Sequence, residues 1–211
     1  MNKREESIIS LIPQSEVLCD CGCDHGYIGE AALSRYIAQK VIFVDISYPS
    51  LQKAQKLCQK KGHFSCEFLC QDGLKEVNAD TAVIAGMGGL EIIDIIANAK
   101  HLPHYLVLSP QRSVAQVREY LCESYVTVKD FILYDKKFYN LMLLQRGKGE
   151  KLNKMEILFG KTNLQEFSQD FKNYLLREKR ICGKILSQAN VSEKEEWLKL
   201  VTLLLEGETQ S

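Results

Sequence analysis

The sequence predicts an α/β protein built on a doubly wound, mostly parallel sheet with an antiparallel closing strand, followed by a small helical unit. Three observations support this fold class. Short apolar runs alternate with helix-like segments over residues 3–121, which is typical of strands joined by crossover helices. Two further apolar runs, 126–134 and 138–145, flank a short polar turn and indicate a pair of antiparallel strands. After residue 148 only the helical spacing of apolar residues remains.

The composition is that of an ordinary globular protein. Of its 211 residues, 45% are hydrophobic and 26% are charged, so we expect one full hydrophobic core and a smaller appendage. No apolar run approaches the roughly 20 residues that a bilayer requires, and no export signal precedes the first expected strand. We therefore expect a cytoplasmic protein without a membrane segment, in which the eight cysteines are thiols.

The expected elements follow one another in regular order. A helix over 3–12 stops at Pro13, before the first strand. The helix over 49–61 has the clearest limits, because Pro49 fits a first helical turn and Gly62 can end the helix. The other expected strands of the parallel part are 16–20, 41–45, 65–69, 81–85 and 105–108, and the other expected helices are 28–36, 90–99 and 114–121.

The C-terminal part of the chain shows a different hydrophobic pattern. It divides the chain into an expected domain of residues 1–147 and a helical unit of residues 148–211. Apolar residues recur at helical spacing over 164–185, and a capping-box pattern of Ser192 with Glu195 starts a second helix. We expect these two helices to form an antiparallel, coiled-coil-like hairpin.

The loop after the first strand carries two acids. Residues 17–29 read VLCDCGCDHGYIG, in which Gly22 and Gly26 allow tight turns and close approach to a ligand. Their spacing is not the G-x-G-x-x-G pattern of dinucleotide binding. Asp20 and Asp24 would repel a pyrophosphate at contact distance. The loop therefore favours a positively charged ligand, bound at the carboxyl ends of the strands.

Two further acids follow neighbouring strands. Asp45 is placed to accept hydrogen bonds from ribose hydroxyls, and Asp72 is placed near an adenine amino group. S-adenosylmethionine combines an ammonium, a sulfonium, a ribose diol and an adenine, so it fits this set better than a dinucleotide does. A glycine-rich loop after the fourth strand leaves room for a methyl donor. The candidate cofactor-binding residues are Asp20, Gly22, Gly26, Asp45, Ile46, Asp72, Gly73, Gly86, Met87 and Gly88.

These segments resemble those of a known family. Residues 20–27, 44–47, 71–74, 84–89 and 156–160 read DCGCDHGY, VDIS, QDGL, IAGMGG and EILFG. They are similar to the bacterial tRNA (adenine-22-N1)-methyltransferase family, TrmK, and the resemblance covers nearly the whole chain. It implies a class I, Rossmann-like methyltransferase domain, S-adenosylmethionine as methyl donor, and a C-terminal helical hairpin that helps to hold tRNA.

The resemblance implies methylation at N1 of adenine, which already carries an in-plane lone pair. The reaction therefore needs the nitrogen, the methyl carbon and the sulfur to be held in line more than it needs a base to remove a proton. The reaction leaves a cationic methyladenine. We therefore assign Asp24 to the exocyclic amino edge of the base, where it favours the developing positive charge, and assign His25 and Tyr27 to positioning the loop or stacking on the base. No Asn-Pro-Pro-Tyr motif follows the fourth strand, which argues against methylation of the exocyclic amine.

A tRNA partner must be held by local basic groups, because the formal net charge of the chain is zero. Extruding the target adenine costs a few kcal/mol, which backbone contacts must supply. The candidate phosphate contacts are Lys3, Arg4, Arg112, Arg118, Lys136, Lys137 and the run Arg177–Arg180. The expected state is a monomer.

Other functions stay open at this point. They are a methyltransferase acting on another RNA or on a small molecule, a noncatalytic RNA-binding module of the same fold, and an NAD-dependent oxidoreductase. A metal site is not expected, because the C-x-C-x-C spacing of Cys19, Cys21 and Cys23 suits a tetrahedral zinc poorly. We expect these three cysteines to lie on one face of a strand and to pack in the core.

Overall fold

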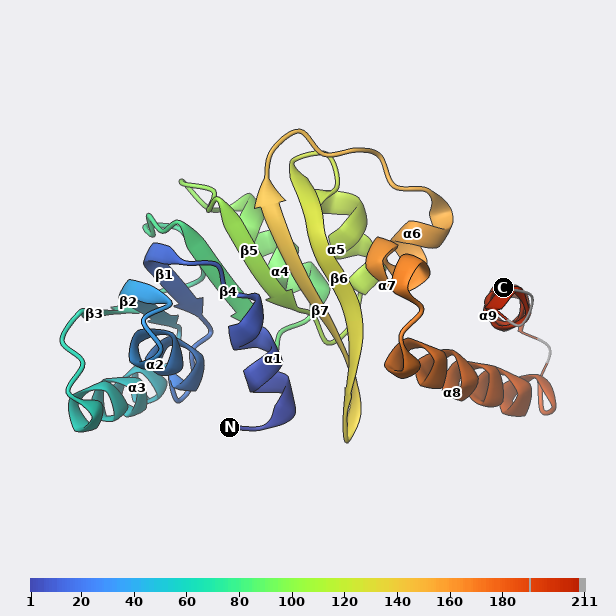
Figure 1. The fold of residues 1–211 in the computed structure, drawn as a ribbon, viewed down its shortest axis with the longest axis horizontal. Coiled ribbons are helices and arrows are strands. Elements are labelled where there is room, and N and C mark those ends of the chain that lie inside the picture. Colours follow the sequence, from blue (N-terminus) through green and yellow to red (C-terminus); the bar gives the residue numbers. More distant parts are fainter. Residues whose placement is uncertain (190, 209–211) are drawn as a thin grey trace.

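A computed structural model of the chain describes residues 1–189 and 191–208. Within these residues the strands form one sheet of seven, in the order β3-β2-β1-β4-β5-β7-β6 (Figure 1). The neighbouring pairs from β3 to β5 are parallel, whereas β7 is antiparallel to both β5 and β6. The strands are β1 (Ser15–Cys21), β2 (Ala38–Asp45), β3 (Cys66–Cys70), β4 (Thr81–Ala85), β5 (Tyr105–Ser109), β6 (Tyr125–Asp135) and β7 (Lys137–Arg146). The predicted fold class is confirmed.

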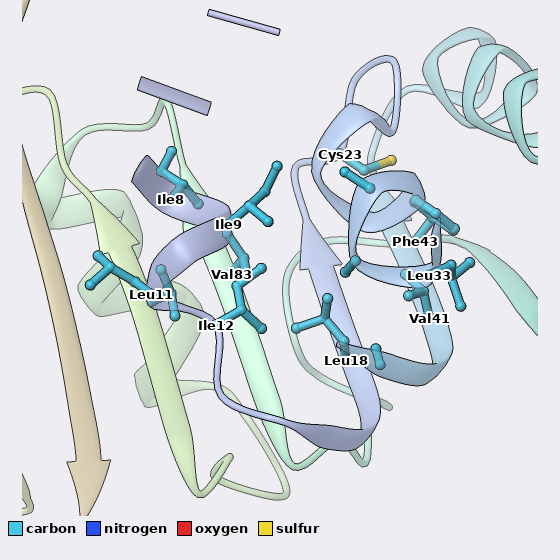
Figure 2. Close-up of a cluster of buried hydrophobic side chains, with 14 of the residues drawn as sticks. Ile8, Ile9, Leu11, Ile12, Leu18, Cys23, Leu33, Val41, Phe43 and Val83 are labelled. Atoms are coloured by element: carbon cyan, nitrogen blue, oxygen red, sulfur yellow. The ribbon is translucent and has the colours of Figure 1, made fainter. Parts of the chain in front are cut away.

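Helices cover both faces of the sheet. One face carries α1 (Lys3–Leu11), α2 (Tyr27–Ser34) and α3 (Tyr48–Lys61), whose apolar residues share a core cluster with Leu18 and Val83. Figure 2 shows part of this cluster, with Ile9 of α1 beside Val83 of β4. The other face carries α4 (Gly89–Ala97) and α5 (Val114–Leu121), packed on a second cluster. Because both faces are covered, the carboxyl edge of the parallel strands is where a ligand can enter.

The cysteines of the first strand are buried, but they do not share one face. Cys19 and Cys21 belong to the cluster under α4 and α5, whereas Cys23 belongs to the cluster under α1 to α3. The alternation of a strand does not apply to Cys23, because β1 ends at Cys21 and the chain turns at Gly22 with a φ of 73°. All eight cysteines are free thiols.

The C-terminal helices differ from the predicted hairpin. They are α6 (Lys154–Phe159), α7 (Lys161–Glu166), α8 (Gln169–Leu186) and α9 (Ser192–Glu208). The helix expected over 164–185 is interrupted at Phe167, whose φ of 42° lies in the left-handed region. Ser168 then starts α8, with its hydroxyl accepting from the Phe171 amide at 3.2 Å.

The last two helices do not lie side by side along their lengths. Figure 1 shows α8 running across the view and α9 nearly end-on, so the two helices cross. Helix α9 also packs on α6, where the Trp197 ring of α9 stacks on the Phe159 ring with 4.9 Å between centroids. The third core cluster joins these helices to Ile132 of β6 through Phe171, Leu175 and Val201. The two predicted C-terminal helices are therefore present as α8 and α9 and pack on each other, whereas a coiled-coil-like geometry for the pair stays a prediction.

Arg118 is not a surface residue, which corrects its prediction as a phosphate contact. Its Nε and Nη2 atoms donate to the Asp130 carboxylate at 2.7 and 3.0 Å, and Nη1 donates to the carbonyl oxygens of Ile157 and Leu158, both at 3.0 Å. Both charged side chains are 4% exposed. This buried pair ties α5, β6 and α6 together.

None of the helices in the described part of the chain is both long enough and apolar enough to cross a bilayer.

Candidate active site

A cavity of about 490 Å³ opens at the carboxyl ends of β1, β2 and β4. Strand order reverses here, since β1 lies between β2 and β4, and ligands of open α/β sheets bind at such points. The cavity brings together ten of the thirteen predicted site residues, which are Gly22, Asp24, His25, Tyr27, Asp45, Ile46, Asp72, Gly73, Gly86 and Met87.

The loop after β1 is fixed across the end of β2 by backbone hydrogen bonds. The amides of Gly22 and Cys23 both donate to the carbonyl oxygen of Val44, at 2.8 and 3.1 Å. A Cβ atom at Gly22 would lie 2.0 Å from Cε of Met87. Glycine is therefore needed at this position both for its positive φ and for clearance from the glycine-rich loop opposite.

Asp45 is held in place by two amides. Its Oδ2 atom accepts from the Asp24 amide at 3.0 Å, and its Oδ1 atom accepts from the Ser47 amide at 2.8 Å. Each carboxylate oxygen has a second lone-pair site. The carboxylate is therefore oriented by the protein and keeps acceptor capacity for two hydroxyl groups from the cavity.

Asp24, His25 and Tyr27 form one cluster at the rim of the cavity. The Asp24 Oδ2 atom lies 2.7 Å from Nδ1 of His25, and Oδ1 lies 3.8 Å from Nζ of Lys53. The rings of His25 and Tyr27 are parallel within 4°, with 5.5 Å between centroids. The arrangement places an exposed carboxylate beside two parallel rings, of which the Tyr27 ring is exposed. Lys53 of α3 is an additional neighbour that the sequence reading missed.

Asp20 does not line the cavity. It is 4% exposed, and its Oδ2 atom accepts from the Gly29 amide in the first turn of α2 at 3.0 Å. That helix has no side-chain cap at Gly26, so Asp20 takes the place of a cap from the neighbouring strand. Burial raises the pKa of Asp20 to about 7.

This raised pKa gives a test of the structure. The folded chain keeps a proton on Asp20 up to about pH 7, whereas the unfolded chain releases it near the ordinary pKa of 3.8. The free energy of unfolding that this group contributes is therefore largest below the unfolded pKa and is lost as the pH rises to about 7. We expect Asp20→Asn to remove this dependence, so the variant gains stability relative to wild type between about pH 4 and about pH 7.

Urea unfolding at several pH values measures the difference. Asp94→Asn, an exposed acid-to-amide change on α4, serves as the control for the change of side chain. A stability difference between Asp20→Asn and wild type that does not vary between about pH 4 and about pH 7 would contradict a buried acid with a raised pKa.

Two predicted glycines also lie outside the lining. A Cβ atom at Gly26 would lie 2.6 Å from Cβ of Ala54 on α3, and one at Gly88 would lie 3.0 Å from Nε of Arg112. Gly26 and Gly88 therefore allow close packing behind the cavity, where they shape the loops that carry the lining residues.

Arg4 is the main residue of the cavity that the sequence reading placed elsewhere. Its Nε and Nη2 atoms donate to the Ser109 hydroxyl at 3.4 and 3.3 Å, and its guanidinium lies 4.9 Å from the centroid of the Tyr139 ring. Burial lowers the pKa of Arg4. The helix that carries Arg4 precedes the first strand, and only its packing across β5 and β7 brings this side chain into the cavity.

Gln111 secures the glycine-rich loop from behind. Its Nε2 atom donates to the carbonyl oxygen of Gly86 at 2.7 Å, and its amide donates to the carbonyl oxygen of Met87 at 2.9 Å. The loop after β4 is therefore held by the segment after β5, and it keeps the cavity wall in a fixed position.

The charges of the lining are unequal. Among the residues that the structure describes, five acids line the cavity against one arginine and one histidine; the acids are Glu5, Asp24, Asp45, Asp72 and Glu91. This excess of carboxylates suits a positively charged ligand that also offers hydroxyl and amino donors. No group of three or more metal-ligating side chains is present in the described part of the chain.

The chain is similar to known methyltransferases. Residues 1–142 match a family described as a methyltransferase domain. A candidate tRNA methyltransferase of Mycoplasma pneumoniae is 30% identical over 68% of this chain and 70% of that protein. The tRNA (adenine(22)-N(1))-methyltransferase of Bacillus subtilis is 31% identical over 70% of this chain and 66% of that protein.

A solved structure shows the same fold. The structure of M. capricolum TrmK in complex with S-adenosyl-homocysteine matches with a TM-score of 0.85 at 24% identity, covering 98% of this chain and 96% of that chain.

Proposed function

This chain belongs to the TrmK-like family of tRNA (adenine-22-N1)-methyltransferases, and we propose that it transfers a methyl group from S-adenosylmethionine to N1 of adenine 22 in tRNA. The single observation that carries the proposal is the acid-lined cavity at the carboxyl edge of the sheet, which joins the predicted cofactor residues to the cluster of Asp24, His25 and Tyr27. Fold likeness alone would not choose the reaction.

The residues present fit S-adenosylmethionine. Asp45, oriented by two amides, would accept hydrogen bonds from the ribose hydroxyls, and Asp72 with the amide of Gly73 would face the adenine. Gly22 and Gly86 leave room for the methionine part, because neither places a Cβ atom against the cavity. When bound, the cofactor supplies an electrophilic methyl group on a positively charged sulfur. The acidic lining stabilises that charge in the bound cofactor and disfavours a ligand with a pyrophosphate at the same place.

The rim cluster would hold the adenine that accepts the methyl group. Asp24 accepts a hydrogen bond from the exocyclic amino group and stabilises the positive charge that develops on the ring. His25 fixes the Asp24 carboxylate through the 2.7 Å contact, and the exposed Tyr27 ring offers a surface on which the base can stack. No residue needs to remove a proton from N1, so the contribution of these groups is orientation and electrostatics.

The division of labour along the chain is also part of the proposal. We assign cofactor binding and methyl transfer to residues 1–147, and part of the tRNA contact to residues 148–211. We propose that the protein acts as a monomer, in the cytoplasm where a tRNA substrate is found. The supporting observation is that every lining residue of the cavity comes from the first part.

The decisive experiment is nucleoside mass spectrometry of unmodified tRNA after incubation with the protein and labelled S-adenosylmethionine. We expect 1-methyladenosine from a tRNA with adenine at position 22, and no incorporation into the same tRNA with guanine there. Label on another nucleotide or on N6 would replace the proposed specificity with that of another RNA methyltransferase. Absence of transfer despite cofactor binding would indicate a noncatalytic RNA-binding module, and calorimetric binding of NAD in place of S-adenosylmethionine would indicate an oxidoreductase.

A further inference from the structure

A second cavity of about 590 Å³ lies between the turn that joins β6 to β7 and the helix α8. We call it the hairpin groove. Its lining includes Lys136, Lys137 and Tyr134 from the hairpin, and Leu176, Arg177 and Arg180 from α8. Figure 1 shows the β6–β7 turn extending beyond the body of the sheet next to α8. The groove is separate from the candidate active site, with which it shares no lining residue.

The hairpin groove concentrates positive charge. Four cationic side chains line it, and within the described residues no aspartate or glutamate does. Two acids lie nearby. Asp170 accepts from the Tyr134 amide and pairs with Lys3, outside the groove. Glu178 accepts from the Trp197 indole and lies 3.6 Å from Arg177, so it offsets part of the charge of this one groove cation. In a chain with zero formal net charge, this is a local field suited to a polyanion.

The walls of the hairpin groove also offer apolar surface. Two large side chains beside the charged groups are exposed, Tyr134 at 46% and Leu176 at 49%. The guanidinium of Arg177 lies 5.8 Å from the centroid of the Phe138 ring. Cations beside an exposed aromatic ring, here that of Tyr134, are an arrangement by which proteins hold a phosphodiester together with an unstacked base.

The first helix connects the hairpin groove to the candidate active site. The Arg4 amide donates to Asp135 at 3.2 Å and Nζ of Lys3 donates to the Tyr134 carbonyl at 2.9 Å, while the Arg4 side chain lines the active-site cavity. In Figure 1 the β6–β7 turn and the carboxyl end of β4 lie toward the same edge of the molecule, with α1 between them.

We propose that the hairpin groove is a second RNA site, which binds a phosphodiester segment with one unstacked base of the tRNA, away from the adenine that is methylated. The proposal rests on the proposed function for the identity of the RNA. The groove supplies affinity and does not take part in methyl transfer, because none of its residues reaches the active-site cavity.

The turn itself offers a favourable substitution. Asp135 pairs directly with Lys137, so Lys136 alone forms the turn, with a φ of 61° in the left-handed region. Glycine adopts this conformation without strain. Lys136→Gly therefore removes a charge from the groove without disturbing the fold, and Arg180→Gln on the facing helix removes a second.

The test compares this double variant, Lys136→Gly with Arg180→Gln, with the control Lys60→Gln with Lys61→Gln, two exposed lysines at the end of α3. We expect the groove variant to bind tRNA at least tenfold more weakly and to lower the slope of log Kd against log salt by about 1–2. Its kcat at saturating tRNA and its Kd for S-adenosylmethionine should match those of the control. If the tRNA affinity and the salt slope equalled those of the control, the proposal that the hairpin groove binds RNA would be wrong.

A third variant tests the unstacked base. We expect Tyr134→Ala to weaken tRNA binding several-fold with no change in the salt slope, because stacking releases no counterions. If the Kd for tRNA were unchanged in this variant, the proposed contact between Tyr134 and an unstacked base would be wrong. The binding titrations do not depend on methyl transfer, so failure of the proposed function would appear separately, as wild-type protein that binds tRNA without methylating adenine 22.

Discussion

Replacing Asp24 by asparagine is expected to reduce kcat about 100- to 1,000-fold, the cost of losing one well-placed electrostatic group at the site of developing charge. The carboxylate sits at the rim, fixed by His25 at 2.7 Å, where it would meet the amino edge of the adenine. Methylation at N1 makes that base cationic, so the interaction strengthens between ground state and transition state. Asparagine also tolerates the left-handed backbone, with its φ of 45° at this position.

The affinity for S-adenosylmethionine should change less than tenfold in this variant. The contact of residue 24 with the cofactor side of the cavity is its amide, which donates to Asp45 at 3.0 Å, and a side-chain substitution leaves that amide in place. Single-turnover kinetics with calorimetric titration of the cofactor separates the two effects.

Asp45→Asn is the matched comparison, because it is the same acid-to-amide change one contact away. It should raise the Kd for S-adenosylmethionine more than tenfold, since an amide nitrogen cannot accept a hydroxyl hydrogen bond. If Asp24→Asn instead weakened cofactor binding as much as it lowered turnover, Asp24 would belong to the cofactor site and not to the chemistry.

The carboxylates that a sequence reading places correctly are those that follow a strand. Asp45 ends β2, and Asp72 lies two residues beyond the end of β3, so parallel strands alone bring both to one edge. The sequence predicts a first strand that ends at Asp20 and therefore places this acid with them. The strand continues to Cys21, so Asp20 still belongs to it, and its side chain caps α2 below the cavity. An error of one residue at a strand end therefore moves a side chain from the ligand to the core.

The parts that could not be predicted depend on contacts between distant segments. Arg4 enters the active-site cavity only because α1 packs across β5 and β7, 105 residues from its partner Ser109. The break at Phe167 escapes a periodicity argument, because Leu164, Phe167 and Phe171 keep helical spacing on both sides of it. The capping box of Asn153 with Glu156 at the start of α6 was a local signal that could have been found.

The buried position of Arg118 reverses the outcome expected of its substitution. If Arg118 were a phosphate contact, Arg118→Met would weaken tRNA binding in a salt-dependent manner and leave the stability of the fold unchanged. In the structure its loss leaves the Asp130 carboxylate buried without its cation and leaves the carbonyl oxygens of Ile157 and Leu158 without a donor. Breaking one side of a buried pair costs about 3–5 kcal/mol.

Urea unfolding should therefore show Arg118→Met to be less stable by about 3–5 kcal/mol, while Arg112→Met, an exposed arginine near the start of the same helix, stays within about 0.5 kcal/mol of wild type. The double variant Arg118→Met with Asp130→Leu should recover much of the loss, because removing both charges also removes the burial cost of each. A single variant as stable as wild type would contradict the structural role. A double variant no more stable than the single would show instead that Arg118 acts mainly through the carbonyl groups of α6, which no substitution of Asp130 can satisfy.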